Sequence, residues 1–159
     1  MPQWVLYQPV IGVLGLIFAW IIYAYVKKQP VGTKVMEDIS EAIHYGAMVF
    51  LKKEYSYLVL FIVVFFLLLF WKINPETAIC FLAGAICSML AGYFGMSAAT
   101  RANVRTSQAA DSEGQGKALS VAFSGGAVMG LSVASLGIIG VGGFFAIFGK
   151  NVSDRKSVV

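Results

Sequence analysis

Residues that usually build active sites are scarce in this chain of 159 residues. It contains one histidine, two cysteines and eight acidic residues. His44 has no cysteine or second histidine at ligand spacing, so we expect a packed or solvated side chain and not a metal ligand. Cys80 and Cys87 lie too far apart on one expected helix for a disulfide, which favours a packing role. No Ser, His and Asp set indicates a hydrolase triad. We predict no catalytic, cofactor-binding or metal-binding residue.

Acidic residues are absent from four long apolar stretches. These stretches span roughly residues 5–26, 55–71, 78–99 and 119–148. Because a bilayer core about 30 Å thick needs about 20 apolar residues in a helix, each stretch can cross a membrane once. The chain is 58% hydrophobic, with a mean hydropathy of +0.78, which exceeds what a soluble domain of this length can bury. We predict an all-α, polytopic transmembrane helical bundle. Intramembrane carboxylates usually mark ion paths, so these four helices alone should not conduct protons.

A basic leader ahead of the first stretch is also missing. Residues 1–4 carry no Lys or Arg and no small-residue cleavage site follows Trp20, so we expect a retained helix and not a signal peptide. The net charge of +4 comes from basic residues that form no continuous run, and no nucleic-acid partner is expected.

Basic residues are concentrated in two of the segments between the stretches. Eight of them lie between stretches one and two or between three and four, whereas the turn between two and three has only Lys72. The eight are Lys27, Lys28, Lys34, Lys52, Lys53, Arg101, Arg105 and Lys117. The positive-inside rule predicts an integral, multi-pass protein, in the cell membrane if the source is prokaryotic, with the N-terminus outside and both long loops cytoplasmic. The same cations could concentrate an anionic substrate, an alternative that remains open.

The segment before the second stretch has helical periodicity. Apolar residues recur there at Met36, Ile39, Ile43, Ala47 and Phe50. No proline interrupts it, so we predict one continuous helix over about residues 35–71 whose first half projects into the cytoplasm. Gly32-Thr33 is the expected start of this helix, and Asn74-Pro75 the expected turn before the next. The predicted helices therefore cover about residues 5–26, 35–71, 78–99 and 119–148.

Small residues along the third and fourth stretches predict close helix packing. They include Gly84, Ser88 and Gly92 in the third stretch and Gly126 and Gly130 in the fourth. In lipid, such spacing lets helix backbones approach closely. We therefore expect Gly126→Leu to impair assembly.

A Gly-x-Gly-Lys sequence lies between the third and fourth stretches, within residues 111–117. It is not expected to bind phosphate, because Asp111 and Ala118 stand where a Walker A loop needs Gly and Ser or Thr, and no strand precedes it. A connecting turn is the favoured interpretation.

Three segments are more specific than helix packing alone requires. They are residues 32–51, residues 101–106, which read Arg-Ala-Asn-Val-Arg-Thr, and residues 117–131. In their letters, order and spacing they resemble the membrane-bound, ion-translocating inorganic pyrophosphatases. The resemblance covers about residues 1–150. The third segment resembles the start of that family's fourth helix.

The resemblance implies a much longer enzyme, of which this chain is about the first quarter. Such an enzyme is a homodimer of sixteen-helix subunits that hydrolyses magnesium pyrophosphate on the cytoplasmic face and drives protons or sodium ions outward. Its hydrolytic centre lies on later helices, around an acidic stretch reading D-V-G-A-D-L-V-G-K-V-E that this chain lacks. We therefore carry over no catalytic or Mg²⁺ ligand and expect the fragment to be inactive. Its implied partners are the lipid bilayer and the missing helices. The segment at Arg101 and the cytoplasmic extension of the second helix would brace the mouth of the site. The choice between H⁺ and Na⁺ and any K⁺ dependence stay open.

Two further expectations concern the end of the chain and its class. Apolar character stops after Phe148, and residues 154–159 read like a translated sequencing adapter. We therefore expect residues 151–159 to be a non-native or disordered tail. The rival class for the protein is a small non-enzymatic four-helix membrane protein, such as an assembly or regulatory subunit.

Overall fold

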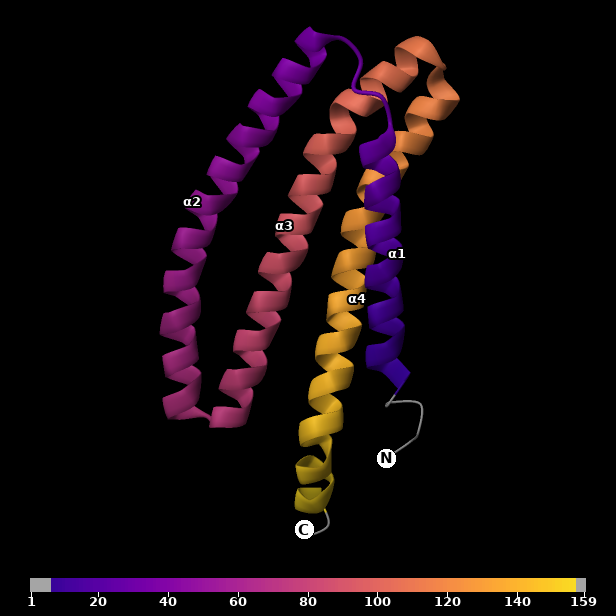
Figure 1. Ribbon diagram of the computed structural model, residues 1–159. Coiled ribbons are helices and arrows are strands. Elements are labelled where there is room, and N and C mark those ends of the chain that lie inside the picture. The colour runs from indigo at the N-terminus through magenta and orange to yellow at the C-terminus, as the bar shows by residue number, and fades with distance from the viewer. Residues whose placement is uncertain (1–6, 157–159) are drawn as a thin grey trace.

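The computed structural model describes the backbone of residues 7–156 and the side chains of residues 7–145. Within this range the chain forms four long helices and no strand, which confirms the all-α prediction (Figure 1). They are α1 (Gln8–Lys28), α2 (Lys34–Lys72), α3 (Pro75–Ser112) and α4 (Gln115–Lys156). All four are long and apolar enough to cross a membrane.

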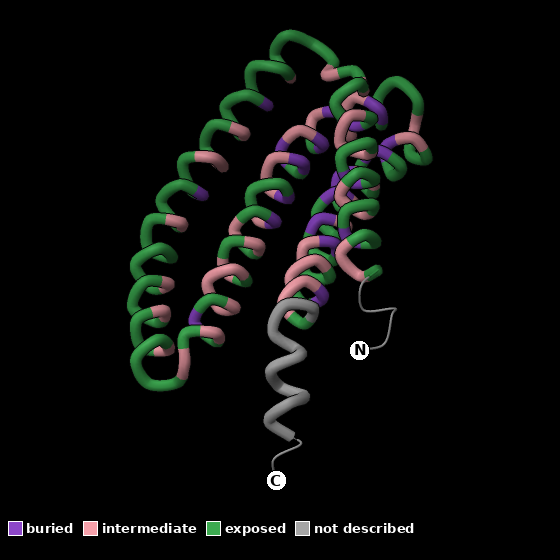
Figure 2. The backbone as a smooth tube through the Cα atoms, turned by 60° about the horizontal axis from the view of Figure 1, so that its bottom comes forward, coloured by how far each residue is buried: buried purple, intermediate pink, exposed green. Residues whose placement is uncertain are grey.

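The helices do not follow one another in space as they do in the sequence. α2 packs on α3, α3 on α4 and α4 on α1, whereas α1 meets α3 only briefly and makes no contact with α2 in the described range. Figure 1 shows α2 on one flank of the bundle and α1 on the other. Buried residues gather on α1, α3 and α4, while α2 is largely exposed (Figure 2). α3 and α4 therefore form the centre of this part of the protein.

Small residues set the contact between α1 and α4. Gly12, Ala19 and Val26 are buried at intervals of seven residues on α1, which places them on one face of the helix. A Cβ atom at Gly12 would lie 2.5 Å from Cγ1 of Ile139. The two backbones therefore approach as closely as a glycine allows.

The contact between α3 and α4 depends on Gly125 and not on Gly126. A Cβ atom at Gly125 would lie 2.5 Å from Cβ of Ala102, whereas one at Gly126 would meet nothing within 4 Å. Within the described residues Gly126 thus lies at no close helix contact, and the predicted effect of Gly126→Leu on assembly with further helices stays a prediction. Consecutive helical residues point about 100° apart, so the neighbour of a contact residue faces away from the contact.

The third and fourth helices are longer than the sequence predicted. α3 covers the expected 78–99 but continues to Ser112, and α4 begins at Gln115, before the expected start at Leu119. No proline or glycine lies between Met96 and Ser112, so nothing stops the helix when its polarity changes. The residues around Arg101, expected in a loop, are therefore helical.

The turns at the helix ends are short. Thr33 caps α2, its hydroxyl accepting from the Met36 amide at 3.4 Å, and Asn74 caps α3, accepting from the Thr77 amide at 2.7 Å. Gly114, at φ +86, lets the chain reverse between α3 and α4. The expected connecting turn is thus reduced to two residues.

The backbone of α4 extends past the expected end at Phe148. It is helical to Lys156, and so includes most of the expected tail 151–159. Residues 157–159 lie outside the described part, as does the expected helix start near residue 5.

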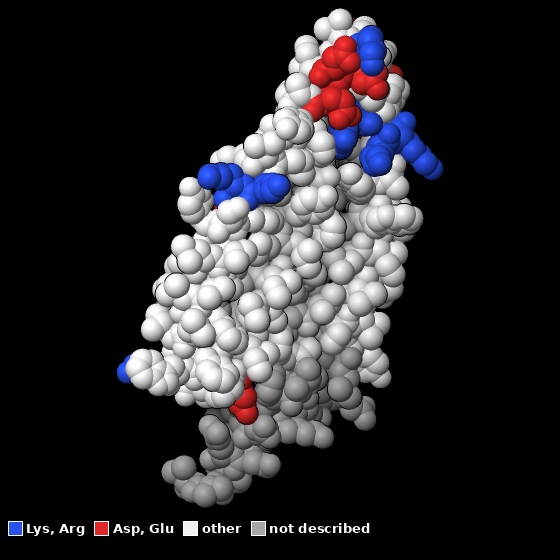
Figure 3. Space-filling view, turned by 60° about the vertical axis from the view of Figure 1, so that its left-hand side comes forward, with Lys and Arg blue, Asp and Glu red and all other residues white. Residues whose placement is uncertain are grey.

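Charge is concentrated toward one end of the bundle, where α1 ends, α2 begins and α3 turns into α4 (Figure 3). We call this the charged end. The opposite end carries only Lys72 and Glu76 among the side chains that the structure describes. At about 1.5 Å per residue, the 39 residues of α2 and the 38 of α3 make helices nearly twice as long as a bilayer core is thick. Their first and last parts respectively therefore project beyond the membrane.

Candidate functional site

The projecting parts of α2 and α3 bring five polar side chains together. Glu41 and His44 come from α2, and Thr100, Arg101 and Arg105 from α3. Glu41 and His44 are three residues apart on α2, and Arg101 and Arg105 are four apart on α3, so each pair lies on one face of its helix. We call these five residues the polar cluster.

An ion pair links Arg101 to Glu41 across the two helices. The Arg101 side chain is 25% exposed and that of Glu41 58%, so water partly screens the pair. The hydrogen bond and the charge of Arg101 lower the pKa of the Glu41 carboxyl, which is therefore ionised at neutral pH. The pair therefore joins the two projecting segments without the large desolvation free energy that a fully buried ion pair costs.

His44 makes a second link between the same helices. Its Nδ1 lies 2.7 Å from the hydroxyl oxygen of Thr100, and that hydroxyl lies 2.9 Å from the Met96 carbonyl oxygen. Because the hydroxyl donates its hydrogen to the carbonyl, the neutral His44 ring donates from Nδ1, and its Nε2 is the unprotonated nitrogen. Burial, and then the charge of Arg101, lower the pKa of the His44 imidazole. The ring is thus held in its neutral form near pH 7.

Arg105 ties the end of α1 to α3. It is only 8% exposed, its Nη1 donates to the Arg101 carbonyl at 2.7 Å and its Nη2 to the Lys27 carbonyl at 3.4 Å. Carbonyls in the last turn of a helix lack partners within the helix, so the guanidinium satisfies one of them. Burial, and then the charge of Arg101, lower the pKa of Arg105, although a guanidinium remains charged. Its Nε is buried without a partner in the described part of the chain.

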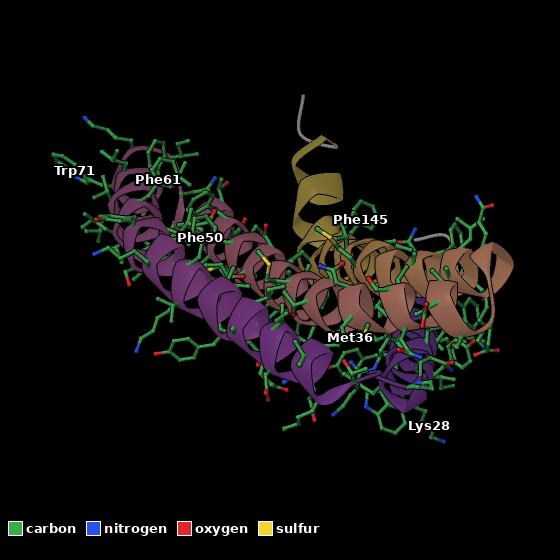
Figure 4. All side chains as sticks on the ribbon, turned by 90° about the horizontal axis from the view of Figure 1, so that it is seen from above. Lys28, Met36, Phe50, Phe61, Trp71 and Phe145 are labelled. Carbon is green, nitrogen blue, oxygen red and sulfur yellow. The ribbon has the colours of Figure 1, made fainter. Side chains whose placement is uncertain are left out.

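The linker between α1 and α2 is packed against the same part of α3. Gly32 has φ +94, a conformation that glycine adopts without strain. A Cβ there would lie 3.1 Å from Cδ of Gln108 and 2.7 Å from the sulfur of Met36. Figure 4 shows Met36 near the start of α2 and Trp71 at the far end of the same helix.

The other residues considered from the sequence lie away from this cluster. Cys80 and Cys87 are free, half-buried thiols beside a cavity of about 560 Å³ between α3 and α4. Lys117 faces Glu113 at 4.0 Å across the turn. In the part that the structure describes, no three His, Cys, Asp or Glu residues gather in a way that could hold a metal ion.

The polar cluster can brace helices but offers no catalytic pair. It has one ionised carboxylate, already paired, together with two guanidinium groups and a neutral imidazole. The sequence indicates Arg101 and Arg105 as members of a specific segment, but it does not indicate their partners on α1 and α2. The helical spacing of polar residues in each segment could have indicated a polar face on each helix. Matching the residues of one face to those of the other required the relative position of α2 and α3.

Comparison with known proteins identifies the same family as the resemblance found in the sequence. The model of a family described as inorganic H⁺ pyrophosphatase matches residues 13–159. The chain is 49% identical over 152 residues to a Clostridium tetani protein provisionally named as a K⁺-stimulated pyrophosphate-energized sodium pump, covering 96% of this chain and 22% of that one. It is 41% identical over 143 residues to a K⁺-insensitive pyrophosphate-energized proton pump of Methanosarcina mazei, covering 89% and 21%.

A third relative is the K⁺-stimulated pyrophosphate-energized sodium pump of Thermotoga maritima. It is 41% identical over 141 residues, which cover 88% of this chain and 19% of the relative. The chain thus spans about a fifth of the length of the curated relatives that it matches, somewhat less than the quarter expected from the resemblance.

Proposed function

The chain belongs to the inorganic H⁺ pyrophosphatase family, and on this basis we propose that it is the N-terminal, four-helix part of a pyrophosphate-energised ion pump. The complete protein hydrolyses pyrophosphate in the cytoplasm and moves protons or sodium ions outward. The observation that carries this proposal is the family match across residues 13–159. The greater length of the relatives supports assigning residues 1–150 to the first four helices of a bundle of about sixteen.

The described residues do not fit the Mg²⁺ that this activity implies. Mg²⁺ is usually bound through carboxylates together with substrate phosphates. Here Glu37 and Asp38 each pair with Lys34 at 3.3 Å, and Glu41 pairs with Arg101. We therefore assign Mg²⁺ and pyrophosphate binding to the rest of the protein, and we expect residues 1–159 alone to be inactive.

The role we assign to this part is structural. α2 and α3 project beyond the membrane, and the polar cluster joins them there through one ion pair and one hydrogen bond. Arg105 fixes the end of α1 to the same place. These links give the later helices a rigid support at the charged end, where the substrate is hydrolysed in our proposal.

Orientation, oligomeric state and ion complete the proposal. The excess of basic residues between α1 and α2 and between α3 and α4 supports a cytoplasmic charged end, with the N-terminus outside. The full-length protein is proposed to be a homodimer. Relatives include both sodium and proton pumps, and both K⁺-stimulated and K⁺-insensitive ones, so the ion is assigned only by experiment.

The test is an activity assay on the full-length protein in inside-out membrane vesicles. We expect Mg²⁺-dependent pyrophosphate hydrolysis together with either acidification of the vesicle interior or sodium uptake. Titration with K⁺ then assigns the subclass. Vesicles that carry residues 1–159 alone are the matched control and should show neither activity.

The opposite outcome is clear. If the full-length protein is inserted and folded but neither hydrolyses pyrophosphate nor transports an ion, the pump assignment is overturned. The protein would then belong with the non-enzymatic assembly or regulatory subunits.

A further inference from the structure

A groove runs between α1 and α3 over the surface of α4. It has a volume of about 410 Å³. Its walls are apolar and aromatic side chains, among them Leu16, Trp20, Tyr93, Phe94 and Val128. Trp20 is 70% exposed, Tyr93 48% and Phe94 42%, so the groove opens to the outside of the bundle. It lies alongside the membrane-crossing part of α1.

The groove has a polar upper end that points toward the charged end of the bundle. There the hydroxyl groups of Tyr23 and Ser97 lie 3.4 Å apart, and both residues line the groove. The ammonium nitrogen of Lys27 lies 5.9 Å from the centre of the Tyr23 ring. Lys28 follows directly in the sequence. Neither lysine forms an ion pair in the part of the chain that the structure describes.

The groove lies between two helices that come close together, since Cα atoms of α1 and α3 approach within 8 Å of each other. A slot of this kind, apolar along the membrane and basic at its mouth, matches an amphiphile with a hydrocarbon chain and an anionic head. Basic pockets between transmembrane helices are known to hold anionic lipid head groups, and tyrosine and tryptophan favour the interface.

We propose that this groove binds an anionic phospholipid, with one acyl chain between Leu16, Trp20 and Tyr93 and its phosphate beside Lys27 and Lys28. The lipid fills the space between α1 and α3 and neutralises the lysines at the end of α1. The inference depends on the chain spanning a membrane and not on the pump activity proposed above.

The first test uses the full-length protein, purified in detergent. Phosphatidylglycerol should raise its thermal unfolding temperature and stay bound in native mass spectra. Phosphatidylcholine with the same acyl chains should do so much less. Soluble glycerol phosphate, which has the head group without the chains, should have no effect. Stabilisation by glycerol phosphate alone would mean a simple anion site and would overturn the lipid assignment.

The second test uses variants. Lys27→Gln should weaken phosphatidylglycerol binding about fivefold, the factor that corresponds to about 1 kcal/mol per basic residue near an anionic surface. Lys72→Gln is the matched control, because Lys72 lies over an aromatic ring, that of Trp71, at the other end of the bundle. Equal binding to both variants would overturn the head-group assignment.

The third test fills the groove. Ser97→Phe places a ring at its polar end, and we expect the protein to lose the retained phosphatidylglycerol. Unchanged lipid retention by a folded Ser97→Phe protein would overturn the groove as the binding site. Because all three readouts are lipid binding and thermal stability, they can succeed or fail whatever pyrophosphate assays show.

Discussion

The contact between Gly125 and Ala102 predicts a specific pattern of stabilities. In Gly125→Ala, the new methyl group would lie 2.5 Å from the Ala102 methyl, whereas carbon atoms in good contact lie about 3.5–4.0 Å apart. Both atoms are fixed to helix backbones, so α3 and α4 must move apart. Overpacking of this kind costs about 1–3 kcal/mol, and the better helix propensity of alanine returns about 1 kcal/mol.

Gly126→Ala is the matched control. It gains the same helix propensity, but its methyl group meets nothing within 4 Å in the described residues. The two variants should therefore differ by about 1–3 kcal/mol, the overpacking cost alone. Ala102→Gly removes the opposing methyl group but costs about 1 kcal/mol of helix propensity, so the double variant Gly125→Ala with Ala102→Gly should recover that difference less about 1 kcal/mol.

Thermal unfolding of the full-length protein in detergent measures this pattern. The expected order of unfolding temperature is Gly126→Ala highest, the double variant above Gly125→Ala, and Gly125→Ala lowest. Equal unfolding temperatures for Gly125→Ala and Gly126→Ala would refute the reasoning. So would a double variant that is no more stable than Gly125→Ala, because the two methyl groups would then not be the cause.

Three other predictions follow from the polar cluster and the helix caps. Arg105→Met should lower the free energy of unfolding by about 1.5–3 kcal/mol because charged hydrogen bonds are lost. Backbone hydrogen exchange should become faster in the residues that follow Lys27. Unchanged exchange there would count against the link between Arg105 and the end of α1. Burial lowers the pKa of His44 below its ordinary value of about 6.5 in the folded protein, so the unfolded chain binds the extra proton and stability should fall as the pH drops through about 6.5. Thermal unfolding at a series of pH values should show a smaller fall for His44→Gln. An identical pH profile for this variant would contradict the prediction. Asn74→Ala should lower stability by about 1 kcal/mol in thermal unfolding, and more than Thr33→Ala does, because its cap bond is 2.7 Å and not 3.4 Å long; the reverse order would refute this.

The existence of four helices followed from the sequence because long apolar runs are a local property. The start of α2 also followed, since Thr33 is a cap residue whose chemistry acts within three positions, whereas α3 begins at Pro75, three residues before the predicted start. The extension of α3 to Ser112 did not follow. Its last part is polar, and a polar segment after an apolar stretch is typical of a loop, whereas no proline or glycine is present there to end the helix.

The relative positions of the helices could not be predicted in the same way. Small residues occur on α1, α3 and α4, and their spacing does not say which of two adjacent glycines faces a neighbour. Gly125 meets Ala102 of α3, whereas Gly126, one residue and about 100° further around the helix, meets nothing within 4 Å in the described residues. The ion pair between Glu41 and Arg101 could not be predicted for the same reason. Each residue lies in a segment that the sequence indicates, but their pairing depends on how the two helices are aligned.

The position of α1 against α4 sets the sequence in which this part of the protein can assemble. The ribosome releases α1 first, but its partner surface, including Ile139 opposite Gly12, is synthesised last. The α2–α3 hairpin can close while α4 is still being made, whereas α1 must wait in the bilayer with the face of Gly12, Ala19 and Val26 uncovered. Residues on that face therefore act at the final docking step, and a defect there should leave a hairpin already formed beside an undocked first helix.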